Sequence, residues 1–170
     1  LEMSRDVANR FNHQMGDTLI PPQAKIQEGT MYVPGTDGEK MSKSKGNIID
    51  IFLADKKLRK QIMKIKTDST PLEEPKNPDT CNLFALYKLV ATEEQIDQLR
   101  EKYLAGNYGY GHAKQEFFEL IIEKYAKERE LYNHYINNLP EIDKALAVGA
   151  KKAHLVADGV LARVRAKLGY

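Results

Sequence analysis

The side chains best suited to chemistry lie close together between Lys40 and Ser44, a stretch that holds two lysines and two serines. Gly38 and Gly46 flank this stretch, and glycines on both sides allow a loop to close over a ligand. Ammonium groups three positions apart neutralise charge on a leaving pyrophosphate, while serine hydroxyls and free backbone N–H groups donate hydrogen bonds to phosphate oxygens. The pattern predicts a polyphosphate-binding loop. The alternative is a basic surface loop that binds nothing.

The distribution of charge supports a polyanionic ligand more than the total does. The chain has 26 basic and 24 acidic side chains, for a net charge of +2. Between residues 40 and 66, however, eight lysines and Arg59 face only Asp50 and Asp55. A solvated helix face usually carries balancing acids, so this excess indicates a surface where a polyanion docks.

The first part of the chain reads as a helix followed by loops. Apolar residues at helical spacing from Met3 to Met15 predict an amphipathic helix, and Gly16 is a typical C-terminal stop. The segment 19–33 is broken by prolines and glycine, so we expect loops with a short strand around residues 31–33 that leads into the lysine loop. Residues 54–66 are expected to form a basic amphipathic helix.

A proline-rich segment, 70–78, is expected to be a hinge between residues 1–69 and a helical part, 79–170. Thr92 and Gln95 form a capping box pattern that opens a helix running to about Ala105. Gly106 to Gly111 resembles a phosphate cradle, but it lacks the preceding strand and following Lys-Ser or Lys-Thr of a P-loop, so we read it as a helix connection.

Two further helices are expected, one that stops before Pro140 and one that begins at Glu141. Their apolar stripes predict a packed helical bundle. The core face of the last helix is expected to hold Leu146, Val156, Val160, Leu161, Val164 and Leu168.

Several classes of site are not indicated. Cys81 is the only cysteine, and the four histidines lack ligand spacing, so neither a disulfide framework nor a metal site is expected. No paired carboxylates or Ser-His-Asp set points to hydrolysis. Without an apolar run of membrane-spanning length or a signal peptide pattern, we expect a soluble, cytoplasmic protein without membrane contact.

The lysine loop, followed by Lys45-Gly46-Asn47, resembles the second signature of class I aminoacyl-tRNA synthetases, Lys-Met-Ser-Lys-Ser. Other large class I enzymes share this signature, so the flanking residues decide. They resemble bacterial-type tryptophanyl-tRNA synthetases in order and spacing along essentially the whole chain. The segments that carry this resemblance are Leu1–Asp6, Arg10–Asn12, Lys64–Ser69, Asn82–Tyr87 and Tyr108-Gly109.

This resemblance implies a mainly α chain: the end of a Rossmann α/β nucleotide-binding domain (1–69), then the hinge and an all-helical anticodon-binding bundle (79–170). It also implies ATP as a substrate with Mg²⁺, tryptophan and tRNA(Trp) as further ligands, and a homodimeric parent enzyme. Lys40 and Lys43 would be catalytic. The ATP-binding set would be Met31, Lys40, Met41, Ser42, Lys43 and Ser44, although strand packing is an equal explanation for Met31. Candidates for tRNA phosphate contacts are Arg59, Lys60, Lys64 and Lys66.

By the same resemblance, the first signature and most of the tryptophan pocket would precede Leu1. We therefore expect a C-terminal fragment that does not form tryptophanyl-adenylate alone. Two alternatives remain open at this stage. One is a fragment of the related tyrosyl-tRNA synthetase, and the other is a non-catalytic RNA-binding module.

Overall fold

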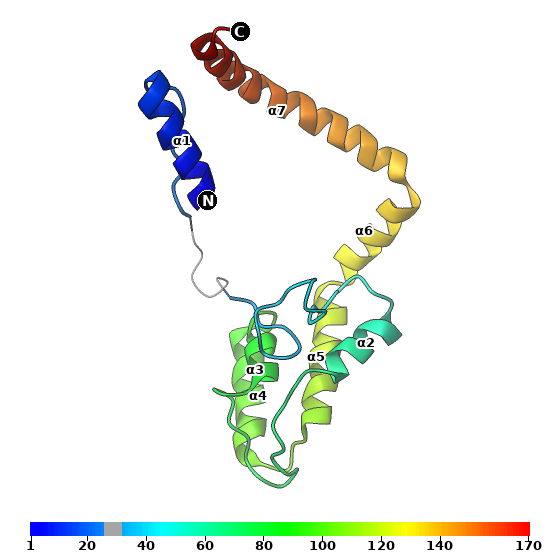
Figure 1. Cartoon of the computed structure of the whole chain (residues 1–170). Helices are drawn as coiled ribbons and strands as arrows, with labels where there is room; N and C mark the ends of the chain where they lie inside the picture. The colour runs from blue at the N-terminus through cyan, green and yellow to red at the C-terminus, as the bar shows by residue number, and fades with distance from the viewer. Residues whose placement is uncertain (26–31) are drawn as a thin grey trace. The chain divides into compact units, whose positions relative to one another are not determined.

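The computed structural model describes residues 1–25 and 32–170 (Figure 1). Within these residues the chain forms seven helices and no strand, so the prediction of a mainly α chain is confirmed. The helices are α1 (Glu2–Met15), α2 (Asp55–Met63), α3 (Asn82–Lys88), α4 (Glu93–Ala105), α5 (Tyr110–Lys124), α6 (Ala126–Asn137) and α7 (Leu139–Leu168).

The short strand expected near residues 31–33 is not seen at Val33, while Met31 lies outside the described residues. The described chain has instead one isolated antiparallel bridge, between Pro34 and Lys40. The chain reverses directly after Pro34, and on the other side Ser42 donates its N–H to the side chain of Asn47, so the pairing stays a single bridge.

The chain divides into two compact units, which are described separately. One comprises Leu1–Gln27 with Tyr135–Tyr170, and the other comprises Glu28–His134. The segment 70–78 lies inside the second unit. The role of this segment as a hinge between a nucleotide-binding part and an anticodon-binding part stays a prediction.

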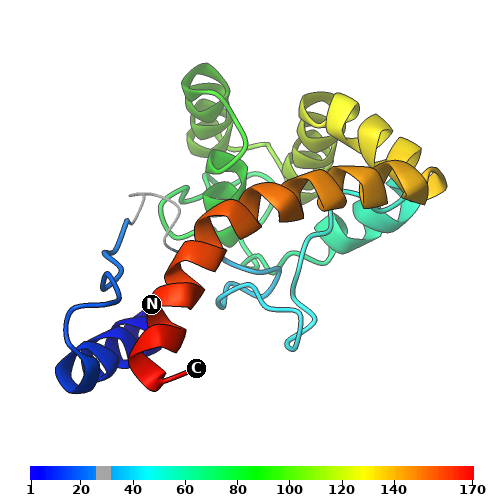
Figure 2. The ribbon, with the colours of Figure 1, turned by 90° about the horizontal axis from the view of Figure 1, so that it is seen from above.

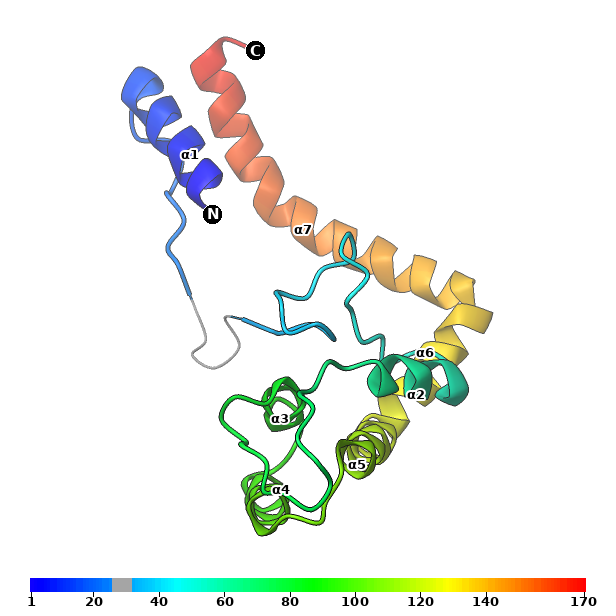
Figure 3. The same ribbon diagram turned by 60° about the horizontal axis from the view of Figure 1, so that its bottom comes forward.

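The core of the second unit is built from α2, α3, α4 and α5, with α2 packed against α5 (Figure 3). Burial of apolar side chains is the main force that holds such helices together. The largest apolar side chains with almost no exposed surface are Tyr87, Tyr103, Phe84, Phe117, Leu58, Ile62, Ile65, Leu83, Leu99 and Ile121.

The proline-rich segment is fastened to this core by Lys76, which is only 2% exposed. Its ammonium donates to the carbonyl oxygens of Pro71, Leu72 and Glu74 at 3.0, 3.3 and 3.1 Å. The same group lies 5.4 Å from the ring centroid of Tyr110. A buried ammonium is costly unless its donors are satisfied, and here three carbonyls satisfy them while closing the segment into a turn.

Helix boundaries follow local signals where those signals are strong. The capping box at Thr92 and Gln95 is present, and α4 ends at Ala105 as predicted. Helix α2 is shorter than predicted, since Lys64 already caps its C-terminus. Pro140 lies in the first turn of α7, which begins at Leu139 rather than Glu141; proline fits there because first-turn N–H groups lack helical partners.

The single long helix expected before Pro140 is two helices. Tyr125 departs from helical geometry, with φ −104° and ψ 19°, and separates α5 from α6. The apolar stripe therefore does not continue as one buried face: α5 buries Ala113, Phe117, Leu120 and Ile121, whereas α6 buries no residue.

The first unit contains α1 and α7, and α1 lies beside the C-terminal half of α7 (Figure 2). Gly16 ends α1 with φ 78°, a conformation that favours glycine. The predicted core face of α7 is wrong: Val160 and Val164 are half-buried, and its other four members are exposed. Among the described residues of this unit, α1 and the segment that follows it flank the helix near Val160, which is too little surface to cover a stripe along 30 residues.

None of the helices in the part of the chain that the structure describes combines the length and apolar character needed to span a membrane.

Candidate functional site

The lysine loop is mounted on a short hairpin. Gly35 donates its N–H to the carbonyl of Glu39 at 2.6 Å, and Met41 donates to the carbonyl of Val33 at 2.9 Å. Gly38 closes the turn by donating to the carbonyl of Gly35 at 3.1 Å, with a positive φ of 88° that favours glycine. The hairpin thus delivers Lys40 and Met41 at a fixed place on the second unit.

A second turn follows within the loop itself. Gly46 donates its N–H to the carbonyl of Lys43 at 3.1 Å, and its φ is 66°. The hydroxyl oxygens of Ser42 and Ser44 lie 2.7 Å apart, within hydrogen-bond distance. Both hydroxyls therefore gather on one turn, beside the two lysines predicted to bind phosphate.

The predicted catalytic ammonium groups face solvent. Lys40 and Lys43 are both exposed, and neither has an acidic partner among the described residues. Lys45 differs, since its ammonium lies 3.9 Å from the carboxylate of Glu39. Because neither ammonium is paired with a carboxylate in the described part of the chain, both are accessible from solvent.

Met41, between these lysines, is half-buried and packs against the core of the second unit. It borders an apolar cavity of about 270 Å³. The wall of this cavity also includes Val33, Ile49, Ile51, Leu86, Leu89, Val90, Phe117, Ile121 and Tyr125. The loop is therefore seated on the helical core through its apolar residue, while its charged residues point outward.

Asn47 was part of the recognised loop pattern, but sequence reasoning gave it no role. Its side chain is buried, with 3% exposed, and its amide nitrogen donates to Asp37 Oδ1 at 2.7 Å and to the carbonyl of Lys40 at 3.2 Å. Its amide oxygen accepts the N–H of Ser42 at 2.8 Å. The hydrogen bond from Asn47 is the main cause that lowers the pKa of Asp37.

The four basic residues predicted to contact tRNA are all exposed, near or on α2. Arg59 Nε donates to Gln115 Oε1 at 2.8 Å, a neutral partner that leaves its charge uncompensated. Asp55, one of only two acids between residues 40 and 66, is paired with Arg129 at 2.5 Å. Since Arg129 takes up that carboxylate, the basic surface keeps its excess of positive charge.

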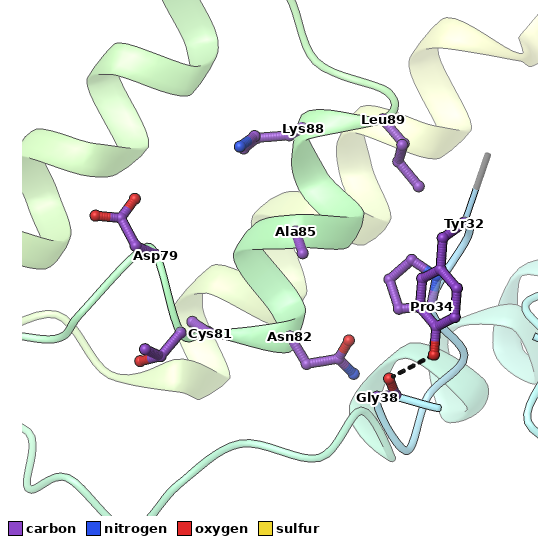
Figure 4. A pocket seen from close by; sticks show the side chains of 10 residues that line it. Tyr32, Pro34, Gly38, Asp79, Cys81, Asn82, Ala85, Lys88 and Leu89 are labelled. Carbon is purple, nitrogen blue, oxygen red and sulfur yellow. Dashed lines mark hydrogen bonds between the residues drawn. The ribbon is translucent and has the colours of Figure 1, made fainter. Parts of the chain in front are cut away.

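A separate groove of about 650 Å³ lies beside the hairpin and the start of α3 (Figure 4). Tyr32 borders it and donates its hydroxyl to the carbonyl of Gly38 at 3.4 Å. Asp79, also on its wall, pairs with Arg100 at 3.1 Å. None of the described residues predicted to bind ATP or tRNA lines this groove, so it is distinct from the lysine loop.

The structure brings five predicted ATP-binding residues together on one loop: Lys40, Met41, Ser42, Lys43 and Ser44. Met31, the sixth, lies outside the described residues. Over residues 1–25 and 32–170, no group of three or more His, Cys, Asp or Glu side chains is placed to hold a metal ion.

Comparison with known proteins assigns the family. The family model described as "tRNA synthetases class I (W and Y)" matches residues 1–126. Similar curated proteins include the tryptophan–tRNA ligase of Fusobacterium nucleatum, 46% identical over 92% of this chain and 48% of its own length. That of Rhodopirellula baltica is 42% identical over 99% of this chain and 53% of its own length.

Among solved structures, a Campylobacter jejuni tryptophanyl-tRNA synthetase complexed with ADP and tryptophan matches with a TM-score of 0.85 and 39% identity. The match covers 99% of this chain and 53% of that one. The chain therefore spans about half the length of the relatives that it matches. The match to the family model over most of its residues shows that this chain belongs to the class I tRNA synthetases of the tryptophan and tyrosine type.

Proposed function

We propose that this chain is the C-terminal portion of a tryptophan–tRNA ligase, which activates tryptophan with ATP and transfers it to tRNA(Trp). The observation that carries the proposal is that Lys40 and Lys43 are exposed on a glycine-flanked loop and have no acidic partner over residues 1–25 and 32–170. The similar proteins named above are tryptophan–tRNA ligases. This disfavours both the tyrosine enzyme and a non-catalytic RNA-binding module.

The chemistry proposed for the loop is charge stabilisation. A carboxylate oxygen of tryptophan attacks the α-phosphorus of ATP, the bond from that phosphorus to the bridging oxygen breaks, and pyrophosphate leaves with its electrons. Lys40 and Lys43 offset the negative charge on the departing phosphates, and the hydroxyls of Ser42 and Ser44 donate hydrogen bonds. Mg²⁺ would enter bound to the ATP phosphates and neutralise part of their charge.

The partners follow from the same assignment. Residues 79–170 would form the anticodon-binding part, and the exposed side chains of Arg59, Lys60, Lys64 and Lys66 would contact tRNA phosphates. Tryptophan recognition would lie mostly in the half of the relatives that this chain does not match. The parent enzyme would be a cytoplasmic homodimer.

ATP–pyrophosphate exchange tests the proposal. The unmatched half of the Fusobacterium nucleatum ligase is fused to this chain, and exchange is measured with tryptophan and with tyrosine. We expect tryptophan-dependent exchange that falls about 100-fold in Lys43→Ala, as when other transition-state donors are removed.

Lys45→Ala is the matched control, because Lys45 lies in the same turn and already pairs with Glu39; it should change exchange little. If exchange depends on tyrosine and not on tryptophan, the amino acid substrate is tyrosine and the proposed specificity is wrong. Exchange that is equal in Lys43→Ala and Lys45→Ala would remove the proposed role of the loop.

A further inference from the structure

Asn47 connects the two ends of the lysine loop. Its backbone carbonyl accepts the N–H of Thr36 at 2.8 Å, from the hairpin turn before the loop. Its side chain holds the backbone at Lys40 and Ser42 and the carboxylate of Asp37, as described above. One buried amide therefore fixes the backbone on both sides of Met41.

The space for this amide is provided by Gly35. A Cβ atom at Gly35 would lie 2.3 Å from Asn47 Nδ2 and 2.4 Å from Asn47 Cγ, closer than any real contact. Gly35 is itself buried, and its carbonyl accepts the side-chain amide of Asn82 at 3.0 Å. Asn47 is thus enclosed by a backbone that is fastened to α3, and its side chain has little freedom to adopt another rotamer.

We propose that Asn47 is the positioning residue of the lysine loop: it sets the backbone from which Lys40 and Lys43 project toward the transition-state phosphates. This inference rests on the proposed function. Asn47 does not touch the phosphates and acts only through the loop backbone. Two lysines on a flexible loop would lose conformational entropy each time they bind, whereas a pre-set backbone lowers that cost in the transition state.

The same geometry explains why an amide is required at position 47. The site demands a donor toward Asp37 and Lys40 and, from the same group, an acceptor toward Ser42. Asparagine supplies both at this length. Aspartate would supply only the acceptor and would place a second negative charge against Asp37, at a distance where two carboxylates cannot both ionise freely.

The test compares Asn47→Ala with Lys43→Ala in the fused enzyme described above. We expect Asn47→Ala to lower kcat for exchange by about 10- to 100-fold, the scale of a small misplacement of catalytic groups. The KM for ATP should rise by a much smaller factor. Amide hydrogen exchange at Ser42, measured on the present chain, should become faster because its acceptor is lost.

Asn12→Ala is the matched control for loss of a well-bonded asparagine. Asn12 also makes three side-chain hydrogen bonds, donating to the carbonyl of Leu19 and accepting from the N–H groups of Thr18 and Leu19. Its hydrogen bonds hold residues 18 and 19 and none of the loop, so its loss should destabilise the protein but lower kcat for exchange much less than Asn47→Ala does.

A charge-swapped pair separates positioning from general damage. Asn47→Asp should be as impaired as Asn47→Ala. Combining it with Asp37→Asn should recover part of kcat, because the hydrogen bonds to residue 37 and to Ser42 are restored while the Lys40 carbonyl stays without its donor. Recovery of this kind is not expected if residue 47 matters only for folding.

The outcomes distinguish the inference from the function on which it rests. If Lys43→Ala is impaired but Asn47→Ala retains kcat, the positioning role is overturned and the proposed function stands. If the swapped pair is no more active than Asn47→Asp, the hydrogen bond between residues 37 and 47 does not position the loop, and that part of the inference is overturned. If Lys43→Ala exchanges normally, the proposed function itself fails, whatever happens at Asn47.

Discussion

Tyr108 donates its hydroxyl hydrogen to Glu116 Oε2 across 2.6 Å. Lys102 reaches the same oxygen at 2.7 Å, and Tyr87 donates to Oε1 at 3.3 Å. One carboxylate on α5 therefore gathers donors from α3, from α4 and from the connection between α4 and α5. Burial near Glu116 raises the pKa of Tyr87 to about 12 and that of Tyr108 further, so both phenols stay protonated donors.

The first prediction concerns Tyr108→Phe. The change removes the hydroxyl and leaves the ring, so the free energy of unfolding should fall by about 1 kcal/mol, the usual net value of such a hydrogen bond. Urea denaturation measures it. Tyr132→Phe is the control, since no described residue accepts a hydrogen bond from its hydroxyl; a loss as large in Tyr132→Phe would contradict the assignment.

The second prediction concerns pH. Burial alone would raise the pKa of Glu116, but hydrogen bonds from Lys102 and Tyr108 outweigh it, and the pKa lies below its ordinary value of 4.5. The folded state therefore binds this proton less readily than the unfolded chain. The stabilisation is present above pH 4.5 and is lost as pH falls through the lowered pKa.

Glu116→Gln should flatten this dependence. Between about pH 5 and about pH 3, the free energy of unfolding should fall less steeply in the variant than in the parent chain. Asp37 and Asp68 also have lowered pKa values, so part of the fall should remain. Identical slopes in the two proteins would show that Glu116 is not the titrating group.

The third prediction concerns the buried Lys76. Lys76→Met keeps the length of the side chain but removes the donors to three carbonyls, and it should lower the free energy of unfolding by about 2–4 kcal/mol. Lys56→Met, at an exposed position on α2, is the matched control and should change stability by less than about 0.5 kcal/mol. Chemical denaturation of both variants measures the two losses. Equal losses of stability in Lys76→Met and Lys56→Met would show that the buried ammonium does not stabilise the fold.

The fourth prediction concerns the basic surface of α2. Replacing Arg59, Lys60 and Lys64 with serine should weaken binding of this chain to tRNA and lower the slope of log K against log salt by about one per lost phosphate contact. Filter binding or fluorescence anisotropy across a salt series measures it. Arg59→Lys, Lys60→Arg and Lys64→Arg together form the control, because they keep the positive charge at the same three positions and should leave the slope unchanged. An unchanged slope in the α2 variant would place the RNA elsewhere.

Sequence reasoning succeeded where structure depends on near neighbours. The capping box at Thr92 and Gln95 and the glycine stop at Gly16 are local signals, and both helix ends are where they were expected. The lysine loop was found for the same reason, because its residues are adjacent. The solvent exposure of the loop depends on tertiary structure and could not be predicted from its own residues.

The failures come from contacts distant in sequence. Lys76 is buried because of the turn around it and the ring of Tyr110. The periodicity of the sequence gives no sign of this burial. Asn47 gained its role from the close approach of Gly35, twelve positions away in the sequence. The apolar stripe of α7 predicted burial correctly only at the half-buried Val160 and Val164, because periodicity identifies a face but not whether the chain supplies something to cover it.

Met41 has a mechanical consequence for the cationic residues on either side of it. Its side chain packs against apolar residues of α3 and α5. The backbone that holds Lys40 and Lys43 is therefore attached to these helices. Any displacement of the backbone at these two lysines has to move those helices as well or separate the thioether from them. Movement of the cations is therefore coupled to movement of the helices for as long as the thioether stays in contact with them.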